Sequence, residues 1–231
     1  MRASCCVRRV SGTALAGAIV IAAWASLAHA GDTRPGFRLL SLSGPFLKWG
    51  TLQLGAPALV RYAYIRKPLE RADGRNCRSM VPFSPAFANG KIPLARIRAE
   101  FRAAFAAWEK AAGLRFEETE DTANADLVIG MQARPRGIAY ADVLQAQART
   151  GKLAGLRNAA VCLNPGVRWE TQFDGNRRTY DIRYVAMHEI GHVIGLDHAG
   201  GSSRTLMNYK YREYFREPQP GDVAGVRRIG G

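Results

Sequence analysis

The sequence predicts a single α+β domain in which two helices cover one mixed, twisted sheet. Two segments with helical periodicity, residues 94–113 and 181–195, stand far apart in the chain. Strand-like segments occur before and between them without regular strand-helix alternation, which favours a mixed fold over a parallel one. Residues 31–231 also have the length of one domain, and 47% hydrophobic residues overall argue against disorder.

The first 30 residues have the features of an export signal. Arg2, Arg8 and Arg9 form a basic start, Thr13–Trp24 is an uncharged apolar run, and Ala28–Ala30 ends in small residues at a cleavage position. The apolar run is shorter than the roughly 20 residues that span a bilayer, so a permanent anchor is the less favoured alternative. We therefore expect a protein secreted to the periplasm or medium, without a membrane segment after cleavage.

The charge of the chain limits its partners. The net charge is +14, and removing the three arginines of the signal leaves +11. Such a charge favours anionic surfaces or polymers. The basic residues are scattered and no nucleic-acid motif accompanies them, so we expect no specific nucleic-acid partner. We expect a monomer.

Two cysteines remain after the signal, since Cys5 and Cys6 leave with it. In an exported protein Cys77 and Cys162 favour a disulfide, with two buried thiols as the alternative.

The elements before the first helix are few. Residues 31–47 belong to a segment rich in glycine and proline and are expected to form an N-terminal arm, followed by the domain proper at 48–231. Leu59–Ile65 alternates and carries β-branched and aromatic residues, which predicts a strand. Residues 66–90 are interrupted by prolines and glycines and predict a loop.

The first helix, 94–113, is the clearest element, with charged residues opposite an apolar stripe and Gly113 as its stop. We assign the stripe to the core: Ile97, Phe101, Ala104, Phe105 and Trp108.

Short strands are predicted after this helix. Leu114–Glu118 alternates, and Leu127–Ile129 is an apolar run suited to a buried strand. Gly137–Val143 and Ala159–Asn164 are weaker strands, with a predicted loop at 147–155 between them.

The second helix begins near Asp181, which is a suitable N-cap, and ends at Gly195. A short closing helix is predicted after Pro220-Gly221-Asp222.

The second helix carries the histidines. His188 and His192 lie one helical turn apart and can direct their rings at one ion. Glu189 is rotated by about 100° from His188, so it can reach a water molecule on the open side of that ion. Gly195 permits a left-handed exit from the helix, which could bring His198 round as a third ligand.

These residue types indicate catalytic zinc. Three neutral imidazoles leave the fourth position of zinc for water, and Glu189 would accept the proton of that water while zinc polarises a scissile carbonyl. The alternative is an ordinary core helix with packed histidines. However, residues 31–231 contain no histidine besides these three, and burying three unpaired imidazoles together would be costly.

The pattern His-Glu-x-x-His-x-x-Gly-x-x-His, residues 188–198, resembles the signature of the metzincin metallopeptidases. Met207, nine residues after His198, resembles their methionine turn, in which the side chain is an apolar floor beneath the ligands. Over residues 48–231 the chain is most similar to the matrixins. The resemblance implies a zincin fold, zinc endopeptidase activity, and protein or peptide substrates.

The resemblance also implies roles outside the helix. Tyr209 is placed like the tyrosine of astacins and serralysins that steadies the oxyanion, while the alternative is an aromatic side chain packed near Tyr211 and Tyr214. Substrate would lie extended along an edge strand, for which Gly137–Ala141 is the best candidate.

The chain also departs from the matrixin pattern. With all three histidines at one site, none is left for a structural zinc, and we find no convincing calcium loop, so we expect one catalytic zinc ion. Cys77 lacks the context of the matrixin cysteine switch.

We therefore expect a secreted zinc endopeptidase. Two alternatives stay open: a zinc hydrolase of a non-protein amide, such as one in a cell-wall polymer, and a catalytically silent basic zinc-binding module. The presence of Glu189 argues against the module, because a structural site needs no base.

Overall fold

The structure is a computed structural model that describes residues 36–230 except 86, 177 and 201–203. The expected export signal and the start of the arm lie outside the described residues. Among the helices in the described ranges, none is both long and apolar enough to cross a membrane.

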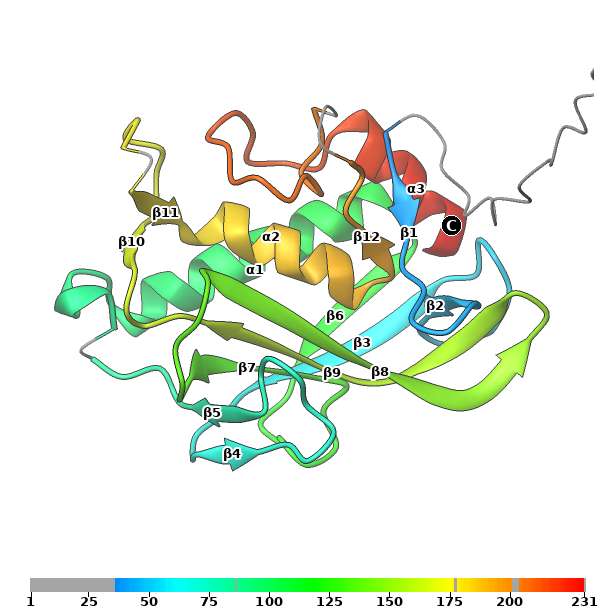
Figure 1. Cartoon of the computed structure of the whole chain (residues 1–231), viewed down its shortest axis with the longest axis horizontal. Helices are drawn as coiled ribbons and strands as arrows, with labels where there is room; N and C mark the ends of the chain where they lie inside the picture. Colours follow the sequence, from blue (N-terminus) through cyan, green and yellow to red (C-terminus); the bar gives the residue numbers. More distant parts are fainter. Residues whose placement is uncertain (1–35, 86, 177, 201–203, 231) are drawn as a thin grey trace, which may run out of the picture. The chain divides into compact units, whose positions relative to one another are not determined.

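A mixed eight-stranded sheet forms one layer (Figure 1), and parallel pairing joins its five main strands in the order β2-β9-β7-β3-β6. These strands are β2 (Phe46–Lys48), β9 (Leu153–Leu163), β7 (Leu127–Gln132), β3 (Ala58–Tyr64) and β6 (Leu114–Glu118). Antiparallel pairing adds three more, which are β8 (Ala139–Thr150) on β9, β5 (Ser79–Val81) on β7, and β4 (Leu69–Glu70) on β5. Because β8 pairs with no described strand other than β9, it forms an edge of the sheet.

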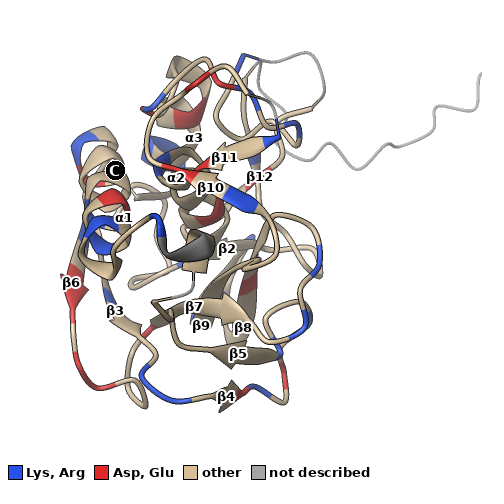
Figure 2. Ribbon diagram, turned by 90° about the vertical axis from the view of Figure 1, so that its left-hand side faces the viewer, with Lys and Arg blue, Asp and Glu red and all other residues tan. Residues whose placement is uncertain are grey.

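Three helices cover one face of this sheet: α1 (Leu94–Ala111), α2 (Ile182–Val193) and α3 (Pro220–Gly230). Figure 2 shows the helical layer stacked on the strands. The α+β prediction is therefore confirmed, with the closing helix as a third member of the layer.

The helix α1 packs as its apolar stripe predicts. All five stripe residues are buried, and Trp108 is fully so. The indole Nε1 of Trp108 donates to the carbonyl of Met187 in α2 at 3.0 Å. Burying a side chain of this size contributes roughly 2 to 3 kcal/mol, and the hydrogen bond aligns the two helices.

Residues 36–47, which the sequence assigns to an N-terminal arm, pack into the fold. They contribute β2 and also β1 (Arg38–Leu39), which pairs with β12 (Leu196–Asp197) just after α2. Phe37 and Leu39 are buried in the main core. This segment therefore stabilises β12, the strand that leads directly to His198.

The predicted loop at 147–155 is wrong. β8 continues to Thr150 and β9 starts at Leu153, so the two strands form one long hairpin. The turn is possible because Gly151 adopts a φ of 56°, which favours glycine. Register shifts after Leu144 and Gln145 break the alternation of side chains that would have indicated a strand.

The remaining two-stranded sheet lies before α2 and joins β10 (Arg168–Glu170) to β11 (Thr179–Asp181). Residues 66–90, predicted as loop, also contain β4, β5 and a 3₁₀ turn at Phe87–Gly90.

Candidate active site

The helix α2 begins where the sequence predicts. The Asp181 carboxylate accepts a hydrogen bond from the backbone N–H of Tyr184 at 2.7 Å, which caps the first turn. The same carboxylate lies 3.1 Å from the Arg216 guanidinium, so the cap is also tied to the segment that precedes α3.

The end of α2 depends on Gly195. Its φ is +101°, and its N–H donates to the carbonyl of His192 at 3.1 Å. A Cβ at this position would lie 2.5 Å from the carbonyl oxygen of Leu47. Glycine is therefore required both for the left-handed turn and for the close approach of β2. The turn sends β12 back along the helix and brings His198 to the other two histidines.

The three imidazoles converge on one point. The Nε2 atom of His198 lies 3.1 Å from that of His188 and 3.3 Å from that of His192. On the far side of two rings, Nδ1 of His188 faces the carbonyl of Leu206 and Nδ1 of His192 faces that of Leu196, both at 2.8 Å. A carbonyl can only accept, so each Nδ1 carries the proton and each Nε2 presents a lone pair.

This arrangement fits a metal ion. Three nitrogens at such separations need a cation between them, and ligating histidines are commonly oriented by a carbonyl at the other ring nitrogen. Burial lowers the pKa of His188 to about 3 and that of His192 to about 4. Both rings are therefore neutral near pH 7 and able to ligate. The donor set of three imidazoles suits zinc.

Glu189 lies beside this cluster, with only 8% of its surface exposed. Burial raises its pKa to about 8, while the backbone N–H of Ala141 in β8 opposes that rise by hydrogen bonding to the carboxylate. A cation held by the histidines would favour the ionised form and lower this pKa. The Glu189 carboxylate is thus buried beside the histidines, between α2 and the edge strand.

Met207 lies directly beneath α2 and is 1% exposed. A Cβ on Gly191 would lie 2.3 Å from its sulfur, so the absence of a side chain at Gly191 makes room for the methionine. The backbone of this turn is held by the buried carboxylate of Asp222, which accepts from Leu206 N–H at 2.7 Å and from Met207 N–H at 3.1 Å.

Sequence reasoning missed the role of Asp222. An acid in the first turn of a helix is common for reasons of the helix dipole alone, so its residue type carries no signal that it supports a distant turn.

Tyr209 is at the rim of the site and is 57% exposed. Its ring centroid lies 6.5 Å from that of His198 in an edge-on arrangement. Tyr211 instead packs against Tyr180 and Tyr184, with centroids 5.0 Å apart in both pairs. Tyr209 is therefore exposed beside His198 rather than packed with Tyr211, and its role in steadying the oxyanion stays a prediction.

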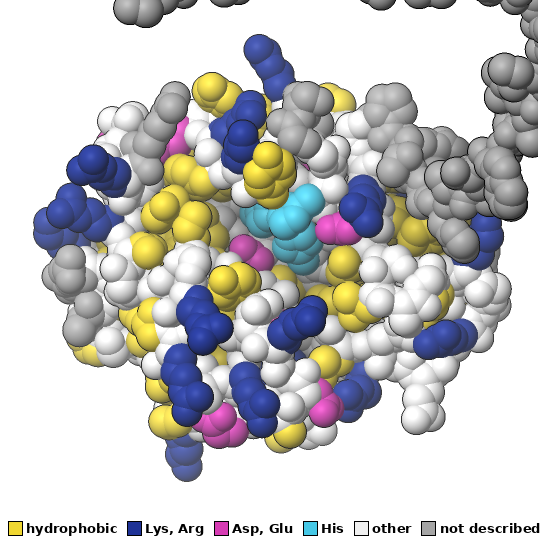
Figure 3. All heavy atoms as spheres, viewed as in Figure 1, with side chains coloured by type: hydrophobic (Ala, Val, Ile, Leu, Met, Phe, Trp, Pro, Cys, Tyr) yellow, Lys and Arg dark blue, Asp and Glu magenta, His cyan; other side chains and the backbone are white. Residues whose placement is uncertain are grey.

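A cleft of about 520 Å³ runs past the histidines. Residues of β8 line one side, and Asn208, Tyr209 and Tyr211 line the other. Figure 3 shows the histidine side chains at the surface of this face, with hydrophobic side chains beside them. Residues 138–141, from the segment predicted to border the substrate, are part of the cleft wall.

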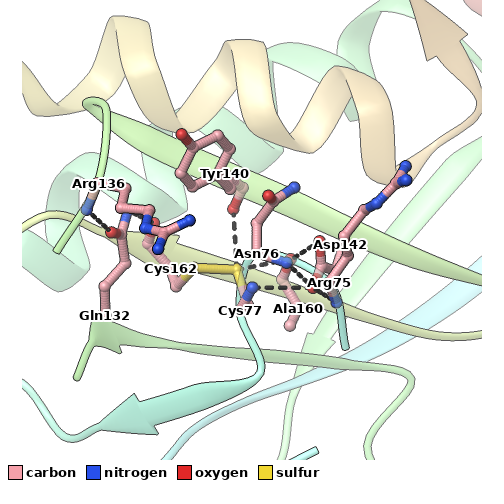
Figure 4. Close-up of a disulfide and its surroundings, with 9 residues drawn as sticks. All are labelled: Arg75, Asn76, Cys77, Gln132, Arg136, Tyr140, Asp142, Ala160 and Cys162. Carbon is pink, nitrogen blue, oxygen red and sulfur yellow. Dashed lines mark hydrogen bonds between the residues drawn. A yellow bond between two sulfur atoms is a disulfide. The ribbon is translucent and has the colours of Figure 1, made fainter. Parts of the chain in front are cut away.

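Cys77 and Cys162 are joined in a disulfide (Figure 4), as the sequence favours. It connects the segment between β4 and β5 to the end of β9 and is fully buried.

A second group of ionisable side chains lies away from the histidines. Oxygens of Glu170, Asp174 and Glu213 all lie within 4.8 Å of one another. Burial, together with the charges of these neighbours, raises the pKa of Glu170 to about 7. The sequence did not reveal this acidic cluster because its members come from separate segments, and we assign no ion to it.

Comparisons with known proteins agree with this geometry. The family model described as matrixin matches residues 83–231. "Metalloendoproteinase 1-MMP" from Arabidopsis thaliana is 31% identical over 142 residues, which cover 58% of this chain and 38% of the plant protein. "Hatching enzyme" from Paracentrotus lividus is 31% identical over 141 residues, covering 58% of this chain and 22% of its own length. Human "Matrix metalloproteinase-19" is 27% identical over 154 residues, with coverage of 61% and 27%. The chain therefore spans less than half the length of these relatives.

Proposed function

Because this chain belongs to the matrixin family, we propose that it is a secreted zinc-dependent endopeptidase. The observation that carries the proposal is the convergence of three Nε2 lone pairs beside a buried glutamate, at the edge of a sheet. An exposed strand edge is where an extended peptide can add as a further strand.

We assign the zinc ligands to His188, His192 and His198. When bound, zinc would polarise the scissile carbonyl and acidify the attacking water. Met207 would support the ligands from below as a packed apolar residue. The Leu206 and Leu196 carbonyls would hold two rings in the ligating tautomer.

Glu189 is assigned as the general base. It would accept the proton of the attacking water and then deliver it to the leaving amine. Its burial supports this role, because a desolvated carboxylate has a pKa closer to neutral and can both take and return a proton. Tyr209 is proposed to donate its hydroxyl hydrogen to the developing oxyanion.

The peptide would bind along β8, with backbone hydrogen bonds to the free edge of that strand. Export is proposed from residues 1–30, so the enzyme would act in the periplasm or the medium on protein or peptide substrates.

The test is to purify the protein, count bound zinc, and compare casein cleavage with that of Glu189→Ala. We expect about one zinc per chain in both proteins and a rate lower by on the order of 10² to 10⁴ in the variant. Equal cleavage by both would contradict the assigned base, and no bound zinc would contradict the metal site.

Peptidoglycan is assayed beside casein in the same experiment. Hydrolysis of the cell-wall polymer without cleavage of any protein would favour the non-protein amide as substrate and contradict the endopeptidase assignment. Bound zinc with no hydrolysis of either substrate would favour a silent zinc-binding module.

A further inference from the structure

The segment between β4 and β5, residues 71–78, borders the active-site cleft, and we call it the rim loop. Asp73, Arg75 and Asn76 line the same cleft as the histidines. The loop is held in place by the Cys77–Cys162 disulfide.

A single carboxylate fastens the rim loop to the edge strand. Asp142 of β8 accepts backbone N–H groups from Arg75 at 2.7 Å, Asn76 at 2.9 Å and Cys77 at 2.8 Å (Figure 4). Asp142 is 6% exposed, so these bonds are shielded from water. The rim loop is therefore fixed in the cleft wall by the disulfide and by the hydrogen bonds to Asp142.

This attachment holds Arg75 in the wall of the cleft that the histidines and Glu189 also line. Asp142 directly follows Ala141, whose N–H contacts the Glu189 carboxylate. The residue of β8 that holds the Arg75 backbone thus directly follows the one that contacts the proposed base. The Arg75 side chain is exposed, and in Figure 4 it reaches away from the disulfide.

Three more exposed arginines lie at the end of the rim loop or near it. The N–H of Ala133 donates to the carbonyl of Ser79 at 3.0 Å where β5 and β7 run antiparallel. Arg78 and Arg134 stand one residue beyond this bond on the same end of the two strands. Arg136 follows shortly after and precedes the cleft residue Ile138. With Arg75, they form what we call the arginine rim.

Within the described residues, none of the four guanidinium groups of the arginine rim forms an ion pair. The nearby acids are engaged elsewhere. Asp142 accepts the three backbone N–H groups, Asp73 pairs with Arg157 at 2.9 Å, and Glu70 accepts from the Ser79 hydroxyl at 2.6 Å.

Like charges on adjacent strands repel each other. Arg78 and Arg134 stand opposite each other where the β5–β7 register continues, so their like charges repel, and an anionic ligand would relieve this repulsion. Arg75 carries a further unpaired charge in the cleft wall.

We propose that the arginine rim recognises acidic residues flanking the scissile bond of the substrate. The occupant is an acidic stretch of the peptide that lies along β8, because Arg75 itself lines the cleft. This inference rests on the proposed endopeptidase function and specifies its substrate class.

The test uses pairs of fluorogenic peptides that differ only in Glu or Gln, scanned through the positions on either side of the cleaved bond. For the unaltered enzyme, kcat/KM is higher for the Glu peptide at one or more positions. Arg75→Gln lowers the Glu-to-Gln ratio by about two- to fivefold, the range for a solvent-exposed ion pair. Replacing all four arginines by Gln brings the ratio close to one, and added salt does the same in the unaltered enzyme.

The matched control is Arg115→Gln. Arg115 is an exposed arginine in β6, at the other edge of the sheet from β8. This variant removes the same charge from the protein and should leave the ratio unchanged. A drop equal to that of Arg75→Gln would mean that only net charge matters and would overturn the proposal.

A binding measurement separates this inference from the proposed function. The same peptides, labelled for fluorescence anisotropy, are titrated into Glu189→Ala, with and without Arg75→Gln. If the Glu peptide binds more tightly than the Gln peptide, and if Arg75→Gln abolishes this difference, the result supports recognition by the arginine rim even when no peptide is cleaved. Cleavage with no preference for Glu overturns the rim and leaves the endopeptidase intact. Binding of dextran sulfate that needs the four arginines, without any preference for Glu peptides, would assign the rim to an anionic polymer and also overturn the proposal.

Discussion

Asp222 offers a test of how the fold supports the proposed zinc ligands. It is fully buried, and its two oxygens accept three backbone N–H groups: Leu206 and Met207 in the methionine turn, and Gln219 before α3. The carbonyl of Leu206 in turn holds Nδ1 of His188. The substitution Asp222→Asn keeps the size of the side chain but replaces one acceptor oxygen by an N–H donor and removes the charge of the carboxylate.

The expected loss of stability and of zinc affinity in Asp222→Asn follows from the hydrogen bonds that the carboxylate accepts. In Asp222, Oδ2 accepts from Leu206 and Gln219 at 2.7 and 2.8 Å, and Oδ1 accepts from Met207 at 3.1 Å. The amide nitrogen of asparagine must replace one of these oxygens, so at least one buried N–H faces another donor. Leaving such a group unsatisfied costs about 1 to 3 kcal/mol of unfolding free energy. Because the carbonyl that orients His188 is in the same turn, zinc affinity should fall roughly 10-fold or more.

The assay combines urea unfolding of the metal-free protein with competition for zinc by a chelator. Asp126→Asn is the control, since Asp126 accepts a single backbone N–H, from Arg61 at 2.8 Å, and lies outside the active-site cleft. We expect the control to change stability by less than about 1 kcal/mol and to leave zinc affinity unaltered. Unchanged stability and zinc affinity in Asp222→Asn would refute the idea that this carboxylate holds the methionine turn.

Three further predictions concern other parts of the molecule. Replacing both Cys77 and Cys162 by alanine should lower the unfolding free energy by about 4 to 5 kcal/mol, because the disulfide closes a loop with a sequence separation of 85; a loss below about 1 kcal/mol in urea unfolding would contradict this. Glu170 has a folded-state pKa of about 7, above its unfolded value, so its contribution to stability is present at low pH and is lost as pH rises toward 7. In a chelating buffer, the melting temperature of Glu170→Gln minus that of the unaltered protein should therefore increase between about pH 5 and pH 8. A constant difference over this range would argue against the raised pKa. Tyr209→Phe should lower kcat by on the order of 10- to 100-fold with little change in KM, and an unchanged kcat would remove this hydroxyl from the mechanism.

Much of the site could be predicted because its pattern is local. The spacing of His188 and His192 places both rings on one side of any α-helix, and Gly195 marks where the helix must end. The apolar stripe from Ile97 to Trp108 similarly indicates a buried helix without reference to the rest of the chain. In each case the regular period of the α-helix determines, from the sequence spacing alone, which side chains lie on the same face.

The sequence was less informative where local patterns are broken. The sequence predicts a loop at 147–155, where the structure has a hairpin, because register shifts interrupt the alternation of side chains there. The sequence predicts only an arm for residues 36–47, which pair with β9 and β12 in the structure, since strands of two or three residues are too short to show a period.

The sequence by itself predicted the family, which the family comparison confirms, and the zinc ligands and base that we propose, because the residues that would carry this chemistry are neighbours on one helix and its exit turn. Only the tertiary structure decided what surrounds them: Asp222 beneath the methionine turn, the rim loop fastened by Asp142, and the arginines beside the cleft. These contacts join segments that are distant in the chain, and most of them run to backbone N–H groups. Every residue except proline has such a group, so the residue types in the sequence do not indicate which backbone N–H a carboxylate binds.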